Sequence, residues 1–267
     1  MNNAINPMND NSTATLKLNP NDLLITLNQK LLECSNAVFF GINALELTTE
    51  LPKELRMEEN SIFIHAPTVE LTIEQSKTNF KNWILKKGFE DLISALTELL
   101  ISFSYVIDLN EKVKANKKIT IQKFKELIYE PNDENSKKDF PKLIDKVSAS
   151  LKEPLKYVEE VKSINRVRRC LVHRNGIVRP LDFNIENELE LKWWFYEINL
   201  IEKGKKKSIE RFDMITDYTK MEINDVQKSK KYKENDRVNF DFQEFNELVN
   251  FCQKFGLDVL EKFILSK

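Results

Sequence analysis

The feature that most constrains the fold is a long run of apolar residues at helical spacing, from residue 73 to about residue 115. Gly88 is placed to interrupt this run. Between Asp91 and Asp108 the only charge is Glu98, but that sixteen-residue stretch is shorter than the roughly 20 apolar residues that span a bilayer. We therefore expect a central helix or helix pair buried in a core, and no membrane segment.

Helical patterns lie on both sides of this run. A long N-terminal helix can be capped by Asn21 or Asp22, and shorter patterns cover residues 120–129 and 140–151. A final amphipathic helix is expected over residues 241–265. The chain is therefore predicted to be mainly α.

A β-hairpin is predicted at about residues 187–215, before the C-terminal helix. Residues 188–201 alternate between apolar and polar with one change of phase, which a bulge near Tyr196 would explain. Residues 203–205, Lys-Gly-Lys, suit the hairpin turn. The polar, lysine-rich stretch over residues 216–236 is predicted to be a loop.

Composition narrows the function classes. The chain carries 41 Lys plus Arg against 42 Asp plus Glu, so any nucleic-acid site must be a local patch. Its three cysteines are far apart and lack CxxC spacing, which argues against a disulfide framework or structural zinc and favours the reducing cytoplasm. No glycine-rich nucleotide-binding motif is present. Residues 1–20 lack signal-peptide features and are expected to be a disordered tail before one domain, residues 21–267.

The candidate site lies on a helix predicted for residues 154–175. Pro154 suits its first turn, where a missing N–H costs nothing, and Gly176 stands where a helix usually ends. Residues 161–180 contain no Asp or Glu and six basic residues: Lys162, Arg166, Arg168, Arg169, Arg174 and Arg179. The same stretch contains His173, whose unperturbed pKa lies near neutral pH. This composition indicates a local positive field.

Helical geometry sorts these residues into faces. The predicted buried stripe consists of Ile164, Val167 and Leu171, widened by Val161 and Val172. Arg168 projects into that stripe, so it must be paired, reach an edge, or face a cavity or partner. Arg169 and His173 are four residues apart and share a different face, with Arg166 beside them.

A histidine that can transfer a proton, beside arginines that can hold a phosphate, suffices for RNA cleavage. The 2′-hydroxyl would attack the adjacent phosphorus, and neither metal nor cofactor is needed. The alternative is a basic helix that merely faces solvent, with His173 capping its end. Helical spacing leaves both interpretations open.

Arg168, followed by four residues and then His173 near a helix end, resembles the R-x(4–6)-H signature of the HEPN superfamily. The next residues, Arg174-Asn175-Gly176-Ile177-Val178, match a recurrent form of the motif helix and its exit. The resemblance covers about residues 154–180, and more loosely the helices from residue 73 onward. It implies a HEPN-like helical bundle with core helices at about 73–175 and 241–265, into which the β-hairpin is inserted.

The resemblance also implies function. Members dimerise so that two Arg/His pairs face one cleft, and they cleave RNA without metal. Arg168 would contact the scissile phosphate and His173 would act as general acid or base. Further RNA contacts are expected from Arg166, Arg169, Arg174 and Asn175. Such proteins often act as toxins or antiviral defence effectors, so an antitoxin or defence-system partner protein is a candidate partner beside RNA and a second copy.

One departure from the family pattern keeps a rival hypothesis open. The residue after the motif arginine is commonly Asn, Asp or His, and here it is Arg169. This leaves the orientation of the catalytic pair open. The rival is a catalytically inactive HEPN-like module that dimerises or binds RNA or a partner protein.

Other conspicuous residues are expected to be structural. His65 is predicted to be an ordinary loop or strand-end residue, and Cys170 a buried thiol. Trp193 and Trp194 could stack on bases, but packing is favoured because at least one should lie in the core. The lysines near the hairpin turn are equally compatible with RNA contact and with solvation. The Glu90-Asp91 pair could reach the Arg/His cleft as a third polar element.

Overall fold

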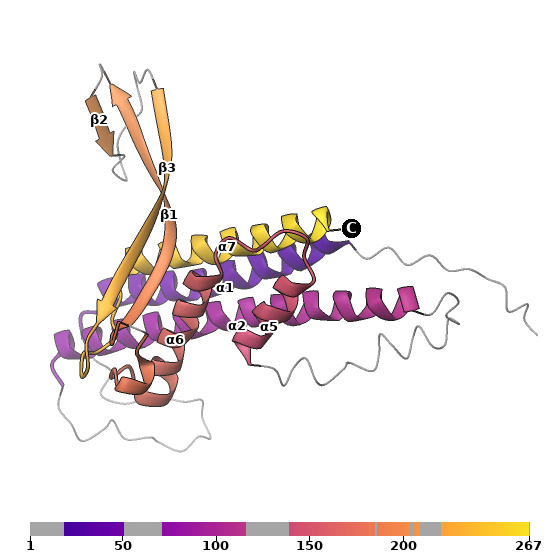
Figure 1. The fold of residues 1–267 in the computed structure, drawn as a ribbon. Coiled ribbons are helices and arrows are strands. Elements are labelled where there is room, and N and C mark those ends of the chain that lie inside the picture. The colour runs from indigo at the N-terminus through magenta and orange to yellow at the C-terminus, as the bar shows by residue number, and fades with distance from the viewer. Residues whose placement is uncertain are drawn as a thin grey trace, which may run out of the picture.

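The structure is a computed structural model that describes residues 19–50, 71–115, 139–184, 186–202, 205–208 and 220–266. It is mainly helical with a β-hairpin before the C-terminal helix, as predicted (Figure 1). The α-helices are α1 (Pro20–Leu47), α2 (Ile73–Ala115), α5 (Phe140–Ala149), α6 (Val158–Arg174) and α7 (Phe242–Leu265). The remaining elements are the 3-10 helix η1 (Pro180–Asp182) and strands β1 (Leu189–Glu202), β2 (Lys205–Ser208) and β3 (Lys220–Tyr232).

Several predictions from the sequence fall outside the described residues. They are residues 1–18 of the predicted tail over residues 1–20, the loop or strand-end position of His65, the helix over residues 120–129, and residues 203 and 204 of the predicted turn over residues 203–205.

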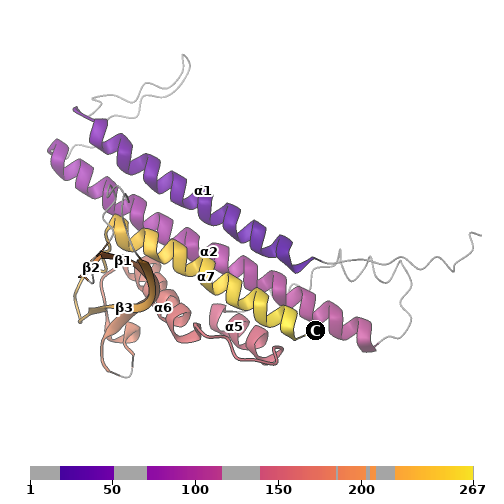
Figure 2. The same cartoon turned by 90° about the horizontal axis from the view of Figure 1, so that it is seen from above.

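Three long helices, α1, α2 and α7, run side by side through the molecule (Figures 1 and 2). α1 packs against α2 and α7, whereas α6 packs against α2, α5 and β1. Figure 2 shows α1 on one side of the molecule and α5, α6 and the sheet on the other. The candidate site and the outer surface of α1 therefore lie on opposite sides.

Gly88 does not interrupt the central helix, so that prediction is wrong. α2 is continuous from Ile73 to Ala115. A Cβ atom at Gly88 would lie 2.5 Å from Cγ2 of Val38 and 2.9 Å from Cε2 of Phe245. The glycine is needed because α1 and α7 approach α2 closely at this point, and the packed neighbours offset the weak helix propensity.

α2 is long and apolar enough to cross a membrane, judged by length and composition, and half of its most apolar window is buried. Leu96 and Leu100 on that stretch are fully buried, whereas the exposed positions include the polar Ser94 and Glu98. The core helix of a soluble protein also meets this criterion. The burial confirms the prediction of a core helix.

The ends of the first and last helices follow local sequence signals. Asp241 caps α7 by accepting a hydrogen bond from the backbone N–H of Glu244 at 2.8 Å. The Glu244 carboxylate in turn accepts from the backbone N–H of Asp241, which completes a capping box. α1 begins slightly earlier than expected, at Pro20, because the Asn19 side chain caps it.

The motif helix begins at Val158, four residues later than the predicted start at Pro154. The intervening segment is held by α7 instead of by helical hydrogen bonds. Leu155 is buried there, and the backbone N–H of Lys156 donates to the Asp258 carboxylate at 2.8 Å. Contacts with a distant part of the chain therefore override the local signal of a proline.

Within the described residues the sheet has three strands, in the order β2-β1-β3, with antiparallel pairing. The pairing of β1 with β2 confirms the predicted hairpin. β3 shows that the predicted loop over residues 216–236 is wrong. Its alternate lysines pair with α7, because Lys228 contacts Glu247 at 2.7 Å and Lys230 contacts Glu244 at 2.9 Å.

The predicted bulge near Tyr196 is also absent. Pairing of β1 with β3 runs without interruption from Leu189 opposite Tyr232 to Ile201 opposite Lys220. The change of phase in the sequence has another cause. The first half of β1 buries residues on one face against the helices, and the second half rises away from them with Tyr196 exposed (Figure 1).

Candidate functional site

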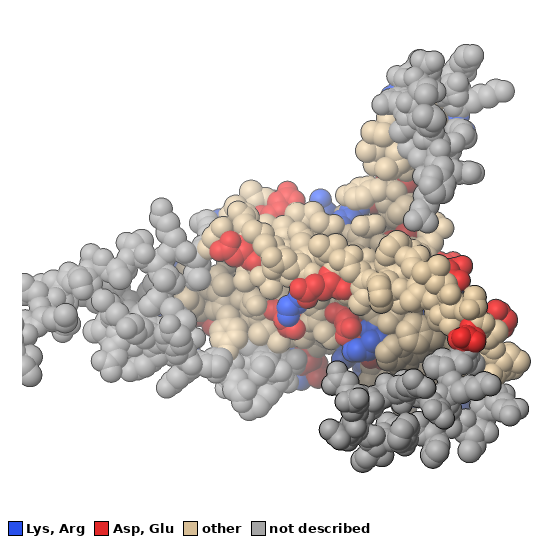
Figure 3. Space-filling model, turned by 180° about the vertical axis from the view of Figure 1, so that it is seen from behind, with Lys and Arg blue, Asp and Glu red and all other residues tan. Residues whose placement is uncertain are grey.

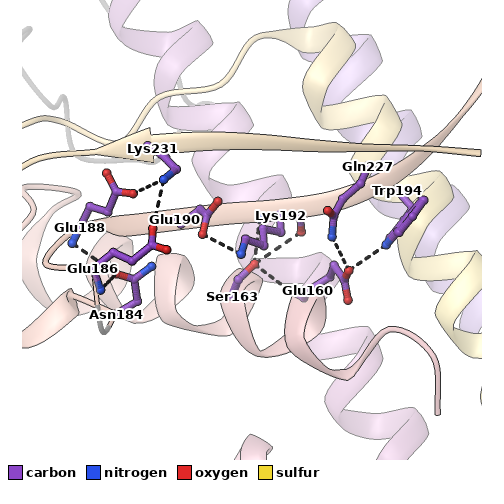
Figure 4. A network of polar contacts seen from close by, with 10 residues as sticks. All are labelled: Glu160, Ser163, Asn184, Glu186, Glu188, Glu190, Lys192, Trp194, Gln227 and Lys231. Carbon is purple, nitrogen blue, oxygen red and sulfur yellow. Dashed lines mark hydrogen bonds and ion pairs between the residues drawn. The ribbon is translucent and has the colours of Figure 1, made fainter. Parts of the chain in front are cut away.

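The motif helix is attached to the sheet through its first turns (Figure 4). The buried carboxylate of Glu160 accepts hydrogen bonds from Nε1 of Trp194 at 2.8 Å and from the side chain of Gln227 at 2.7 Å. One turn later, the hydroxyl of Ser163 accepts from the backbone N–H of Lys192 at 2.8 Å. These contacts fix which sides of α6 face the protein and which remain open.

The buried side of α6 follows most of the sequence prediction. Ile164, Val167, Leu171 and Val161 are at most 3% exposed. Val172 is 42% exposed, so its predicted place in the stripe is wrong. Cys170 is fully buried, as predicted, and desolvation raises the pKa of its thiol to about 11.

The open side of α6 carries three cationic or titratable side chains, Arg166, Arg169 and His173, which we call the cationic face. At 100° per residue they fall within an arc of about 60°, opposite the buried stripe. Arg169 and His173 are exposed and Arg166 is half-buried. None of the three has a hydrogen bond or ion pair with another residue in the described part of the chain. By contrast, Lys162 on the same side pairs with Asp145 of α5 at 3.1 Å.

Arg168 does not belong to this face. It is half-buried and lies within the buried arc, about 140° around the helix from His173. Its Nε is buried and has no hydrogen-bond partner among the described residues, and the same holds for Nε of Arg166. A buried, unpartnered donor is costly, so the surroundings of both arginines are incomplete, and only Arg168 lies within the buried arc.

Arg174 is occupied by an intramolecular partner. Its Nε donates to Asp182 at 2.8 Å, and its Nη2 contacts the other oxygen of the same carboxylate. Asp182 is 3% exposed and also accepts from the backbone N–H of Arg179 at 3.0 Å. The hydrogen bond to Asp182 raises the pKa of Arg174. The guanidinium therefore fastens the exit of α6 to η1, which argues for a structural role beside the predicted RNA contact.

Asn175 and Gly176 also form the helix exit. Both have positive φ, 51° and 77°, and the N–H of Gly176 donates to the carbonyl of Cys170 at 3.1 Å. The predicted helix stop at Gly176 is confirmed. Asn175 accepts a weak hydrogen bond from Nζ of Lys86 at 3.4 Å, which brings a cation of α2 to the end of α6.

Sequence reasoning missed Asp182 and Lys86. Neither has a signal in the sequence, because both meet α6 only through the fold. The suggestion that Asp91 reaches the cleft is wrong, because it pairs with Lys87 at 2.7 Å and lies near Cys34 of α1. Burial raises the pKa of the Cys34 thiol, and the negative charge of Asp91 adds to that effect. Glu90 shows no hydrogen bond or ion pair to α6 among the described residues.

The two tryptophans pack, as favoured. Trp193 is 2% exposed and donates to Glu247 at 2.9 Å, and Trp194 donates to Glu160. Lysines of the sheet also pair within the protein. Lys206 lies 3.6 Å from Glu222, and Lys231 contacts Glu186 and Glu188 (Figure 4). Because these lysines are paired with carboxylates, the sheet has less free positive charge with which to bind RNA.

The arrangement offers one open set of groups able to hold an anion and move a proton, the cationic face of α6. An exposed imidazole can exchange protons with solvent, and neighbouring guanidinium groups can hold phosphate oxygens. Comparison with known proteins finds no matching family model, curated protein or solved structure.

Proposed function

We propose that this protein is a metal-independent endoribonuclease of HEPN type, with α6 as its catalytic helix. The observation that carries the proposal is the cationic face. Arg166, Arg169 and His173 lie on one side of a well-anchored helix and have no partner among the described residues. Unpaired cations on a rigid element are suited to an anionic ligand because little energy is lost in positioning them.

The chemistry needs one bond formed and one broken. The ribose 2′-oxygen attacks the adjacent phosphorus, and the bond from phosphorus to the 5′-oxygen breaks. His173 accepts the proton of the 2′-hydroxyl or donates one to the departing 5′-oxygen. Arg169 and Arg166 stabilise the negative charge that develops on the phosphoryl oxygens. The products are a 2′,3′-cyclic phosphate and a 5′-hydroxyl.

Arg168 enters the proposal through the family resemblance, which assigns it to the scissile phosphate. Arg168 and His173 point to different sides of the same helix, so one copy of α6 does not bring them together. A catalytic role for Arg168 therefore requires a second copy of α6 packed against the first, as in the homodimer that the resemblance implies. The unpartnered Nε of Arg168 supports this requirement.

The test is digestion of single-stranded RNA in EDTA by the full chain and by His173→Ala. We expect fragments with 2′,3′-cyclic phosphate ends from the wild type and almost none from the variant. Lys162→Ala is the matched control, because Lys162 lies on the same side of α6 but is paired with Asp145. Intact RNA with the wild type, or equal cleavage by His173→Ala, would overturn the proposal.

The second candidate is a HEPN-like module that binds RNA or a partner protein without cleaving it. Arg169 in place of the family's Asn, Asp or His favours this candidate, because it removes a residue type that orients the catalytic pair. It predicts that the wild type retards RNA in a gel and leaves it intact. In either case the setting we propose is a cytoplasmic toxin or antiviral effector, with an antitoxin or defence protein as partner.

A further inference from the structure

A second surface with exposed apolar residues lies on α1, on the side of the molecule opposite to α6 (Figure 2). α1 buries Leu27, Leu31 and Val38 against α2 and α7. Its outer side exposes large apolar residues: Ile25 is 53%, Leu32 60%, Phe40 76% and Leu47 82% exposed. Several large exposed apolar side chains along one side of a helix are candidates for an interaction site.

The outer side of α1 has a regular order. At 100° per residue, seven positions spaced three or four apart fall within an arc of about 80°. This outer line consists of Ile25, Gln29, Leu32, Asn36, Phe40, Asn43 and Leu47. Apolar residues alternate with amides along it from Ile25 to Leu47. Asp22, three residues before Ile25, lies within the same arc and places one charge at its N-terminal end. Figure 3 views the molecule from this side and shows uncharged surface interrupted by groups of acidic and basic side chains.

The outer line is complementary to itself when two helices run antiparallel about a two-fold axis at Asn36. Each residue then faces one of its own kind. The pairs are Ile25 with Leu47, Leu32 with Phe40, Gln29 with Asn43, and Asn36 with Asn36 of the second copy. Antiparallel helices also align their dipoles favourably. Amides within an apolar seam hydrogen-bond to each other and fix the register, as single Asn residues do in coiled coils.

The length of the outer line is also compatible with a protein–protein interface. α1 has 28 residues and is therefore about 42 Å long. A standard stable interface buries roughly 800 Å² on each partner. An antiparallel partner that contacts the outer line over this length would cover most of one side of the helix.

We infer that the outer line of α1 is an interface with a second copy of this chain, formed by antiparallel pairing of the two α1 helices. The inference does not depend on the proposed ribonuclease activity. Because α1 and α6 lie on opposite sides of the molecule, this pairing leaves both α6 helices uncovered (Figure 2). An α6 homodimer would then be a separate contact, and both together would give an assembly larger than a dimer.

Charge placement tests the pairing and its direction. Leu32→Lys combined with Phe40→Lys puts like charges opposite each other, and we expect it to remove one association step in sedimentation at micromolar concentration. Leu32→Lys combined with Phe40→Glu places Lys opposite Glu only in the antiparallel arrangement, so it should restore association. Both sites are exposed, so the fold should be retained. Failure of the Lys/Glu variant to associate, while the wild type does, would overturn the antiparallel pairing.

Disulfide cross-linking detects the contact between two α1 helices directly, whatever the number of copies in the assembly. Asn36→Cys places two thiols at the two-fold axis and should form an intermolecular disulfide under mild oxidation. Ala37→Cys, an exposed neighbour on the same helix but about 100° away, is the matched control and should not. Equal cross-linking of both, or of neither, would overturn the inference. So would a wild type that stays monomeric or binds lipid vesicles through α1.

Discussion

Arg169 and Arg174 lie five residues apart on the same helix, in opposite surroundings. Arg174 meets a buried carboxylate in two places, and its charge is neutralised inside the protein. Arg169 is exposed and has no partner among the described residues. The sequence alone gives the two arginines the same description, as parts of one basic stretch. The difference shows that a run of basic residues can contain both a structural clasp and a surface available to a ligand.

The largest expected effect concerns the open side. His173→Ala should lower RNA cleavage by about 10²- to 10⁴-fold, the usual contribution of a positioned proton carrier, with unchanged unfolding free energy. Arg169→Ala should lower cleavage by a comparable factor if the helix faces decide the assignment. If Arg168→Ala abolishes cleavage while Arg169→Ala only weakens RNA binding, the family assignment of Arg168 to the scissile phosphate holds and the role of Arg169 in stabilising the phosphoryl oxygens fails. Cleavage rates, urea unfolding and RNA titrations measure these three outcomes.

Loss of the Arg174–Asp182 ion pair should lower the stability of the fold and leave RNA cleavage by the folded protein little changed. Asp182→Ala leaves Arg174 partly buried without its partner and removes the hydrogen bond to Arg179, so we expect a loss of about 3 kcal/mol in unfolding free energy. Urea denaturation followed by circular dichroism measures it. Arg169→Ala serves as the comparison and should change stability by less than about 0.5 kcal/mol. Similar losses for both variants would remove the distinction drawn between the two arginines.

A smaller effect is expected at the helix exit. Gly176 has φ of 77°, and an added Cβ would lie 3.3 Å from Cδ2 of Leu171, so Gly176→Ala should destabilise by about 1–2 kcal/mol. Asn175→Gly is the matched change at the preceding left-handed position. It relieves strain there and loses only the weak contact with Lys86, so thermal unfolding should shift little. A larger loss for Asn175→Gly would show that Lys86 matters more than the backbone.

The smallest expected effect on stability at neutral pH comes from Cys170, on the buried side of α6. Burial raises the pKa of Cys170 from its ordinary value of 9.0 to about 11. Folding therefore favours the neutral thiol, so this contribution to stability is complete below about pH 9 and is lost as the pH rises toward 11. Unfolding free energies across this range should fall more steeply for the wild type than for Cys170→Ala. Parallel curves would contradict it.

Local signals in the sequence located several elements closely. Asp241 and Glu244 three residues later set the start of α7, because a capping box depends only on neighbouring residues. Gly176 marked the end of α6, because its backbone conformation excludes most other residues. Ile164, Val167 and Leu171 were correctly placed in the core by helical period alone.

The tertiary structure decided what depends on distant neighbours. Gly88 stays helical because α1 and α7 pack closely there, and β3 forms because β1 supplies its hydrogen bonds while glutamates of α7 neutralise its lysines. In the same way, Asp182 converts Arg174 into a clasp although nothing in the spacing links them. The sequence determined helical periods, caps and the location of the basic helix, since these arise from residues within a few positions. Which cations of that helix are free was decided by the fold, because a charge is neutralised only by a partner that folding brings within contact distance.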